Sequence, residues 1–281
     1  MTTQAARSYG PSALGEGGRR FTELALTMAR TEFKLRYFGS VLGYVWSLVR
    51  PLLFFTVLYL FFTKVVKLGH GVPHYGLYLL TNIVLWAFLA EATGNAVNCL
   101  VVREGLLRKV RFPRMVIPLS VSLTATFNLA MNFVTVIVFA LASGIFPSVS
   151  WLELIAVAVG FIVLGSGIGM LLSALYVRFR DVAPIWEVAL QVWFYGSPVM
   201  YFANAYRHFG HVFQQIAMVN PTATLLTQAS HALIGGHEYP SAAARAYGIG
   251  PVLGAIAVII FIFALGWWFF VHEAPRVAEK L

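Results

Sequence analysis

The chain has 281 residues, of which 59% are hydrophobic and 11% are charged. This composition excludes an ordinary soluble domain, which carries about 25% charged residues because its surface faces water. Lysine and arginine outnumber aspartate and glutamate by 20 to 11, so the positions of the basic residues must distinguish a nucleic-acid partner from a membrane.

The N-terminal residues 1–18 contain no apolar run typical of a cleaved signal peptide, and we interpret them as a disordered cytoplasmic tail. The next segment, 21–38, is too charged to cross a bilayer. At about 100° per residue its polar and apolar side chains fall on opposite faces, with Glu32 as the exception. The polar face holds Glu23, Thr27, Arg30, Thr31 and Lys34, and the apolar face holds Phe21, Leu24, Ala25, Met28 and Leu35. This pattern predicts an amphipathic helix in the cytoplasmic interface, either a plain anchor or a contact for a partner.

Six later segments are long and apolar enough to cross a membrane, which takes about 20 residues for roughly 30 Å of hydrocarbon. They lack the period-two alternation of barrel strands and therefore predict helices. The spans are about 45–66, 76–98, 116–143, 152–176, 184–202 and 249–271. The sequence thus predicts an all-α membrane protein with six transmembrane helices, a single transmembrane domain over 19–273 and a cytoplasmic tail over 274–281.

The basic residues between the spans predict the orientation of the chain. With the N-terminus in the cytoplasm, 16 of the 20 lysines and arginines lie on the inner side, and only Lys64, Lys67, Arg207 and Arg245 lie outside. Both termini are therefore expected in the cytoplasm. Membrane lipid with anionic headgroups, and not nucleic acid, then accounts for the basic excess.

The inner loop 101–118 mixes charges with apolar side chains that an ordinary connection does not need. Residues 103–112 can form two or three helical turns before Pro113 ends them. Two interpretations fit equally well, a helix lying on the membrane surface and a helix that docks into a soluble subunit. The residues concerned are Arg103, Glu104, Leu106, Leu107, Arg108, Lys109, Val110, Arg111 and Phe112.

The longest outer segment, 203–248, contains two apolar pieces, 212–219 and 222–236, separated by Asn220 and Pro221. Their polar residues, Gln214, Gln215, Gln228 and His231 among them, argue against two further crossings. We expect two short re-entrant helices before the last span, because such backbone is tolerated only where protein or a cavity surrounds it.

Catalytic signals are scarce. The chain has no G-x-x-x-x-G-K-[ST] phosphate loop and no H-E-x-x-H pair, so we expect no catalytic site, metal or cofactor in this chain. The single cysteine, Cys99, excludes an intramolecular disulfide and a thiolate metal cluster. Glu91 and Glu187 lie near the inner ends of two spans, where pairing with cytoplasmic arginine or lysine explains them better than a proton relay.

Two patterns within the spans concern helix packing. A polar stripe on the third span fits interhelical hydrogen bonds at least as well as a pore lining, and it consists of Ser120, Thr124, Asn128, Asn132 and Thr135. On the fourth span, Gly165, Gly169 and Ser173 recur at four-residue spacing and predict a close helix contact.

Several motifs occur in one order along most of the chain. The run FKLRYFGSVLGYVWSLVRPLL (33–53) contains Lys34, Arg36, Tyr37, Ser40, Leu42, Gly43, Trp46 and Pro51. The run LLRKVRFPRMVIPL (106–119) contains Lys109, Phe112, Pro113, Arg114 and Pro118, and is followed by YVRFRDV (176–182), WFYGSPVMY (193–201) and NPTATLL (220–226). These motifs resemble those of the type-2 ABC exporter permeases, which move polysaccharides and related polymers to the cell surface.

The resemblance implies a half-transporter in a bacterial cytoplasmic membrane. Two copies of the chain would form the pore, and a dimer of a separate cytoplasmic ABC ATPase would supply ATP and Mg²⁺. The substrate would be a lipid-linked glycan such as O-antigen, cell-wall galactan, capsule or teichoic acid. The alternatives are an ABC permease for a small drug or lipid, and an ion-coupled carrier that works alone.

The resemblance also implies roles for the segments described above. The 21–38 helix would be the family's interface helix, with Glu23, Arg30, Lys34 and Arg36. Residues 103–112 would be the coupling helix, and Asn220 with Pro221 would belong to the outer gate. Aromatic residues stack on the apolar face of sugar rings, and the expected lining residues are Trp46, Phe55, Tyr59, Trp193, Phe194, Tyr195 and Tyr201.

Overall fold

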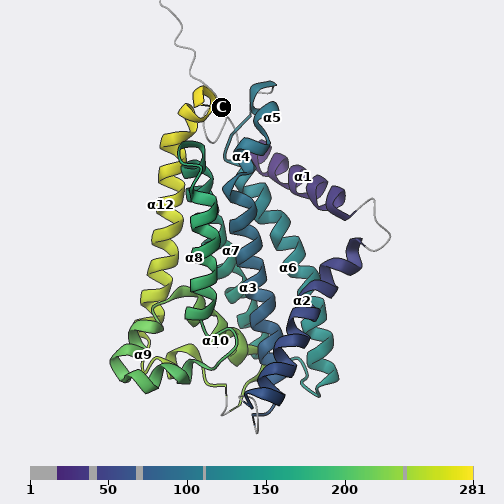
Figure 1. Ribbon diagram of the computed structural model, residues 1–281, viewed down its shortest axis with the longest axis vertical. Helices are drawn as coiled ribbons and strands as arrows, with labels where there is room; N and C mark the ends of the chain where they lie inside the picture. The colour runs from purple at the N-terminus through teal and green to yellow at the C-terminus, as the bar shows by residue number, and fades with distance from the viewer. Residues whose placement is uncertain (1–17, 38–42, 68–71, 110–111, 237–238, 281) are drawn as a thin grey trace, which may run out of the picture.

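A computed structural model describes residues 18–37, 43–67, 72–109, 112–236 and 239–280. Within these ranges the chain forms helices joined by turns and no β-strand (Figure 1). Four of the described helices are long and apolar enough to cross a membrane, namely Tyr75–Val97, Val116–Ala142, Val149–Arg178 and Gly250–Glu273. The prediction of an all-α membrane protein is therefore confirmed. Of the predicted tail 1–18, residues 1–17 lie outside the described residues, and Gly18 begins the first helix.

Helix α1 (Gly18–Tyr37) lies obliquely across one end of the bundle and packs on α6 (Figure 1). Its predicted polar face is exposed at all five positions. Ala25 and Ala29 are buried against the bundle, and the Phe33 ring meets Phe127 of α6 edge-on at 5.7 Å between centroids. The amphipathic helix is thus confirmed, although Leu35, on its predicted apolar face, is 73% exposed.

The first predicted span forms α2 (Gly43–Leu60), which continues directly into a π-helical turn, η1 (Phe61–Val65). Pro51 lies inside α2, where its ring removes one backbone hydrogen bond. The apolar part of this unit, Pro51–Val65, is shorter than the four long spans.

The centre of the bundle is α3 (Tyr75–Val97), packed between α6 (Val116–Ala142) and α7 (Leu152–Arg178). A Cβ on Gly165 would lie 3.5 Å from the Cβ of Ala92, and one on Gly169 would lie 3.0 Å from that of Ala96. The predicted small-residue seam is therefore confirmed as the contact between α7 and α3. Glycine also allows α7 and α12 (Gly250–Lys280) to approach closely, because a Cβ on Gly266 would overlap the carbonyl oxygen of Gly167.

The fifth predicted span, 184–202, is interrupted in the structure. Helix α8 (Val182–Gly196) ends before Ser197, whose backbone is extended because the following proline disfavours the helical conformation. The buried carbonyls beyond it are bonded by α3: Tyr78 Oη donates to the carbonyls of Pro198 at 2.8 Å and Tyr201 at 2.6 Å. Irregular backbone inside a membrane protein needs such partners.

The end of the bundle opposite α1 carries the short elements η2 (Val149–Trp151), η3 (Ala203–Phe209), α9 (His211–Ala217), α10 (Pro221–Ile234) and α11 (Ala242–Arg245) (Figure 1). Helices α9 and α10 stand where the sequence places two short helices, and Asn220 and Pro221 separate them. Ser150 and Trp151 donate to the carbonyls of Ala232 and Leu233 at 2.8 and 3.2 Å, which satisfies the last turn of α10.

The other end of the bundle carries α1, the C-terminal end of α12 and the two short helices α4 (Cys99–Val102) and α5 (Glu104–Lys109) (Figure 1). Helix α5 lies inside the segment predicted as a helix over 103–112, while Val110 and Arg111 lie outside the described residues. The last helix is longer than its predicted span, because α12 continues to Lys280.

Candidate functional site

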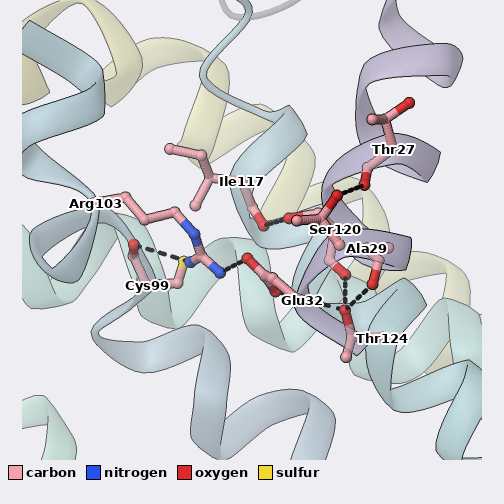
Figure 2. Close-up of polar contacts among 9 residues, drawn as sticks. Thr27, Ala29, Glu32, Cys99, Arg103, Ile117, Ser120 and Thr124 are labelled. Carbon is pink, nitrogen blue, oxygen red and sulfur yellow. Dashed lines mark hydrogen bonds and ion pairs between the residues drawn. The ribbon is translucent and has the colours of Figure 1, made fainter. Parts of the chain in front are cut away.

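A polar cluster joins α1, α4 and α6 at the end of the bundle that carries α5. Its central contact is an ion pair between Glu32 of α1 and Arg103, the residue at the bend between α4 and α5. Arg103 also donates through Nη1 to the carbonyl oxygen of Cys99 at 3.2 Å (Figure 2). Burial lowers the pKa of the Arg103 guanidinium below its ordinary value, and the carboxylate partner favours the charged form.

Helix α6 contributes Thr124 to this cluster. Its hydroxyl donates to the carbonyl oxygen of Ser120 at 2.9 Å, and it also lies 3.4 Å from the carbonyl oxygen of Ala29 and 3.5 Å from Glu32 Oε2 (Figure 2). Glu32 therefore pairs with Arg103 before α5, and Thr124 of α6 lies beside its other carboxylate oxygen.

A second polar contact joins α1 to α3 and α6. Arg36 forms an ion pair with Glu91 of α3, and Asn128 of α6 donates to the same carboxylate oxygen at 2.6 Å. The prediction that Glu91 pairs with a basic residue is confirmed. The polar stripe of the third span is confirmed as a source of interhelical bonds, because Thr124 and Asn128 both belong to it.

A cavity of about 180 Å³ lies between these two ion pairs. Asn95 of α3 and Asn98, which follows α3, line it and are exposed. The other lining residues are Glu32, Arg36, Cys99, Val102, Arg103, Val121 and Thr124. The ion pairs therefore border a small water-accessible space at the end of the bundle.

The predicted coupling residues begin at Arg103, directly after α4, and continue through α5 to Phe112. Leu107 and Phe112 are half-buried against a core cluster that also contacts Phe21 and Met28 of α1. Leu106, at 41% exposure, and Lys109 point away from the protein, and Glu104 is half-buried. Val110, Arg111 and the side chain of Arg108 lie outside the described residues.

The predicted interface-helix residues separate into two groups. Glu23, Arg30 and Lys34 lie on the exposed face of α1, whereas Arg36 reaches Glu91. Glu32 was not among the predicted site residues. Its signal in the sequence was its position as the one charge that breaks the amphipathic pattern of α1.

At the opposite end of the bundle, Asn220 is the centre of a hydrogen-bond network. Its Oδ1 accepts from the Thr222 amide at 3.2 Å, which caps α10, and from Trp193 Nε1 at 3.1 Å. Its Nδ2 donates to Ser197 Oγ at 3.2 Å. Asn220 and Pro221 thus link the start of α10 to α8 and to the break that follows α8.

The predicted aromatic residues differ widely in exposure. Phe55 is 7% exposed and packs on Tyr59 and Phe139, while Trp46 and Tyr195 are 57% and 65% exposed. Phe194 and Trp193 pack on Trp86 of α3, and Tyr201 donates to the carbonyl oxygen of Tyr195 at 3.0 Å. The exposed members lie on α2 and α8, which both flank α3.

The described helices form a membrane protein with four long apolar spans and an amphipathic helix at one end of the bundle. The sequence model of the family described as "ABC-2 type transporter" matches residues 23–233, three quarters of the chain, and the chain belongs to this family. The match includes α1, the 99–109 segment and α10, so the polar cluster and the outer network both lie within the family's domain.

Curated relatives extend the match to nearly the whole chain. An O-antigen export system permease protein RfbA from Klebsiella pneumoniae is 29% identical over 243 residues, covering 85% of this chain and 91% of that protein. The protein of the same name from Myxococcus xanthus is 28% identical over 264 residues, covering 93% of this chain and 96% of that protein. The similarity therefore extends over most of this chain and most of each relative.

Proposed function

We propose that this chain is the transmembrane subunit of an ATP-driven ABC exporter that moves a lipid-linked polysaccharide, O-antigen or a similar surface glycan, out of the cytoplasm across a bacterial inner membrane. The observation that carries the proposal is the similarity to O-antigen export permeases over almost the full length of both chains. Membership of the ABC-2 family supports the exporter mechanism.

The proposed topology has six crossings with both termini in the cytoplasm. Beside the four long spans, α2 with η1 comprises residues 43–65, and 23 helical residues extend roughly 34 Å. Helix α8 followed by the extended chain at 197–202 would complete the fifth crossing. Helices α9 and α10 would re-enter the outer leaflet, and the bonds of Asn220, Gln214 and Tyr206 to neighbouring segments support backbone of this kind.

The proposed assembly contains two copies of this chain and two copies of a cytoplasmic ATPase, which would bind ATP and Mg²⁺. The sequence of this chain has no phosphate loop of its own, and this fits a separate ATPase subunit. Helix α5 would be the coupling helix. Its exposed Leu106 and Lys109 are available to a partner below the membrane, while Leu107 attaches it to the bundle.

The polymer would pass along aromatic surfaces of α2 and α8. A long glycan that slides through a pore needs many weak contacts, and aromatic rings offer these to the apolar faces of sugars. Trp46, Tyr59 and Tyr195 are the predicted lining residues that remain exposed in the single chain. Movement of the coupling helices during ATP hydrolysis would widen the path by rigid-body shifts of the helices that they contact.

The test is surface glycan display in cells that lack this chain, complemented with the wild-type permease and either an active or a hydrolysis-deficient ATPase partner. The proposal predicts that display needs both the permease and ATP hydrolysis, and that lipid-linked glycan accumulates in the cytoplasm without them. Normal display in cells without the chain would contradict the proposal.

A further inference from the structure

The helical backbone between α3 and α5 is interrupted at two positions. Helix α3 ends at Val97, and Asn98 and Arg103 interrupt the helix on either side of α4 with φ, ψ values of −99°, 6° and −103°, 20°. A continuous helix would transmit a rotation of α5 directly to α3. Because the helix is interrupted twice within six residues, the backbone alone transmits movement of α5 to α3 poorly. Other contacts must therefore fix the direction of α5 relative to the bundle.

The Glu32–Arg103 ion pair is a contact of this kind, and it lies at the second interruption, directly before α5. Arg103 is the residue directly before α5, and its guanidinium bonds both to Glu32 of α1 and to the carbonyl of Cys99, at the start of α4. The side chains of Arg103 and Glu32 are 20% and 26% exposed, so water screens the pair less than it screens a surface ion pair.

Glu32 is in turn fixed to the first long helix after the coupling segment. Thr124 of α6 lies 3.5 Å from the second carboxylate oxygen, and Ala29, one turn before Glu32, is fully buried against the bundle. The Phe33–Phe127 contact holds the next residue of α1 on α6. Arg103, Glu32 and α1 therefore form a route of contacts from the start of α5 to α6, beside the packing of Leu107 on the core cluster.

We propose that Glu32 is a positioning residue of the exporter, which ties the coupling segment 98–109 to the interface helix α1 so that both move as one body on α6. The inference rests on the proposed function, because it assigns the contact through which ATPase movement reaches the transmembrane helices. Glu32 touches neither nucleotide nor glycan in this assignment and acts through Arg103.

Charge exchange tests the pair. Glu32→Arg places two guanidinium groups together, and we expect surface glycan to fall by about tenfold or more, while the ATPase subunit still copurifies with the permease and hydrolyses ATP. The reciprocal variant, Glu32→Arg with Arg103→Glu, restores the pair in reverse and is expected to recover export. Thr31→Arg, one residue away on the exposed face of α1, is the matched control and is expected to export as the wild type does.

The outcomes separate this inference from the proposed function. Wild-type display that depends on the chain, together with full export by Glu32→Arg or no recovery in the reciprocal variant, would overturn the positioning role alone. Display that does not depend on the wild-type chain would overturn the proposed function first. Should Glu32→Arg fail to reach the membrane, Glu32→Gln keeps the shape of the side chain, and export equal to the wild type would then overturn the role.

A measurement on the permease alone checks the contact without transport. Cys99 is the only cysteine, it is 2% exposed, and its carbonyl is bonded to Arg103. We expect a maleimide to modify Cys99 several-fold faster in Glu32→Arg than in the wild type, because loss of the pair frees α4 to open. Equal rates in the wild type, Glu32→Arg and Thr31→Arg would overturn the inference.

Discussion

Glycines decide how closely the long helices approach one another. The Cα of Phe263 on α12 would lie 2.7 Å from a Cβ on Gly167, and a Cβ on Gly266 would overlap the carbonyl of Gly167. Both positions face the contact between α7 and α12, where only a residue without a side chain permits this distance. In contrast, a Cβ on Gly94 of α3 would meet no atom within 4 Å.

We therefore expect Gly266→Ala to lower the thermal stability of the purified permease. The added methyl group forces α12 away from α7 and costs about 1–3 kcal/mol as overpacking. Gly94→Ala is the matched control, because the same change in an open helical position is neutral or stabilises by up to about 1 kcal/mol. The midpoint of unfolding in detergent measures both, and equal midpoints would contradict the packing described for α7 and α12.

Asn220 stabilises the outer end of the bundle through its hydrogen bonds at the start of α10. We expect Asn220→Ala to destabilise the outer end of the bundle by about 1–2 kcal/mol, because the cap of α10 and the bond to Trp193 are both lost. Gln215→Ala, at an exposed position of α9, is the control. Tryptophan fluorescence during thermal unfolding reports the change, and a transition unaltered by Asn220→Ala would contradict the assignment of the network.

At the scale of elements, hydrophobic length was the reliable signal. The predicted spans 76–98 and 116–143 correspond to α3 (Tyr75–Val97) and α6 (Val116–Ala142), because an apolar run that must cover a bilayer has few alternative boundaries. The interruption after Gly196 was missed as a boundary, although the Ser197–Pro198 dipeptide carries the local reason for it. Tyr78 of α3, which bonds the carbonyls beyond this break, is more than 100 residues away in the sequence.

The Glu32–Arg103 pair could not be predicted either, because its two residues are also far apart in the sequence. Its members are 71 residues apart, and periodicity within α1 shows only that Glu32 breaks the pattern, not which residue it meets. A helix inside 103–112 is confirmed by α5, and the coupling role stays a prediction. The interruptions at Asn98 and Arg103 depend on backbone angles that the sequence does not display. Long-range side-chain pairing therefore limits a prediction from one sequence more than helix placement does.

Helix α5 allows a prediction at this scale. We expect Leu107→Pro to abolish export and to leave membrane insertion intact, because proline breaks a helix that lies outside the spans. Leu107→Ala keeps the helix and removes only part of the packing against the core cluster, so its loss of export should be smaller. Surface glycan display and the amount of permease in the membrane are measured together, and full export by Leu107→Pro would contradict the coupling assignment.

For the whole molecule, the proposed function requires one arrangement, in which α1, α5 and the end of α12 share the cytoplasmic side and α9 and α10 lie on the other. Figure 1 shows these two groups at opposite ends of the bundle. The sequence expectation of cytoplasmic termini came from 16 of 20 basic residues on one side. An ATPase can reach α5 only if this orientation holds.

The most direct test is the side from which single cysteines react in intact cells. Gly105→Cys in α5 and His208→Cys in η3 are introduced separately with Cys99→Ala, since a side chain at Gly105 meets no atom within 4 Å and His208 is exposed. The account predicts that a membrane-impermeant maleimide modifies His208→Cys in intact cells and modifies Gly105→Cys only after the membrane is opened. Modification of Gly105→Cys from outside intact cells would contradict it, because no cytoplasmic ATPase could then bind α5.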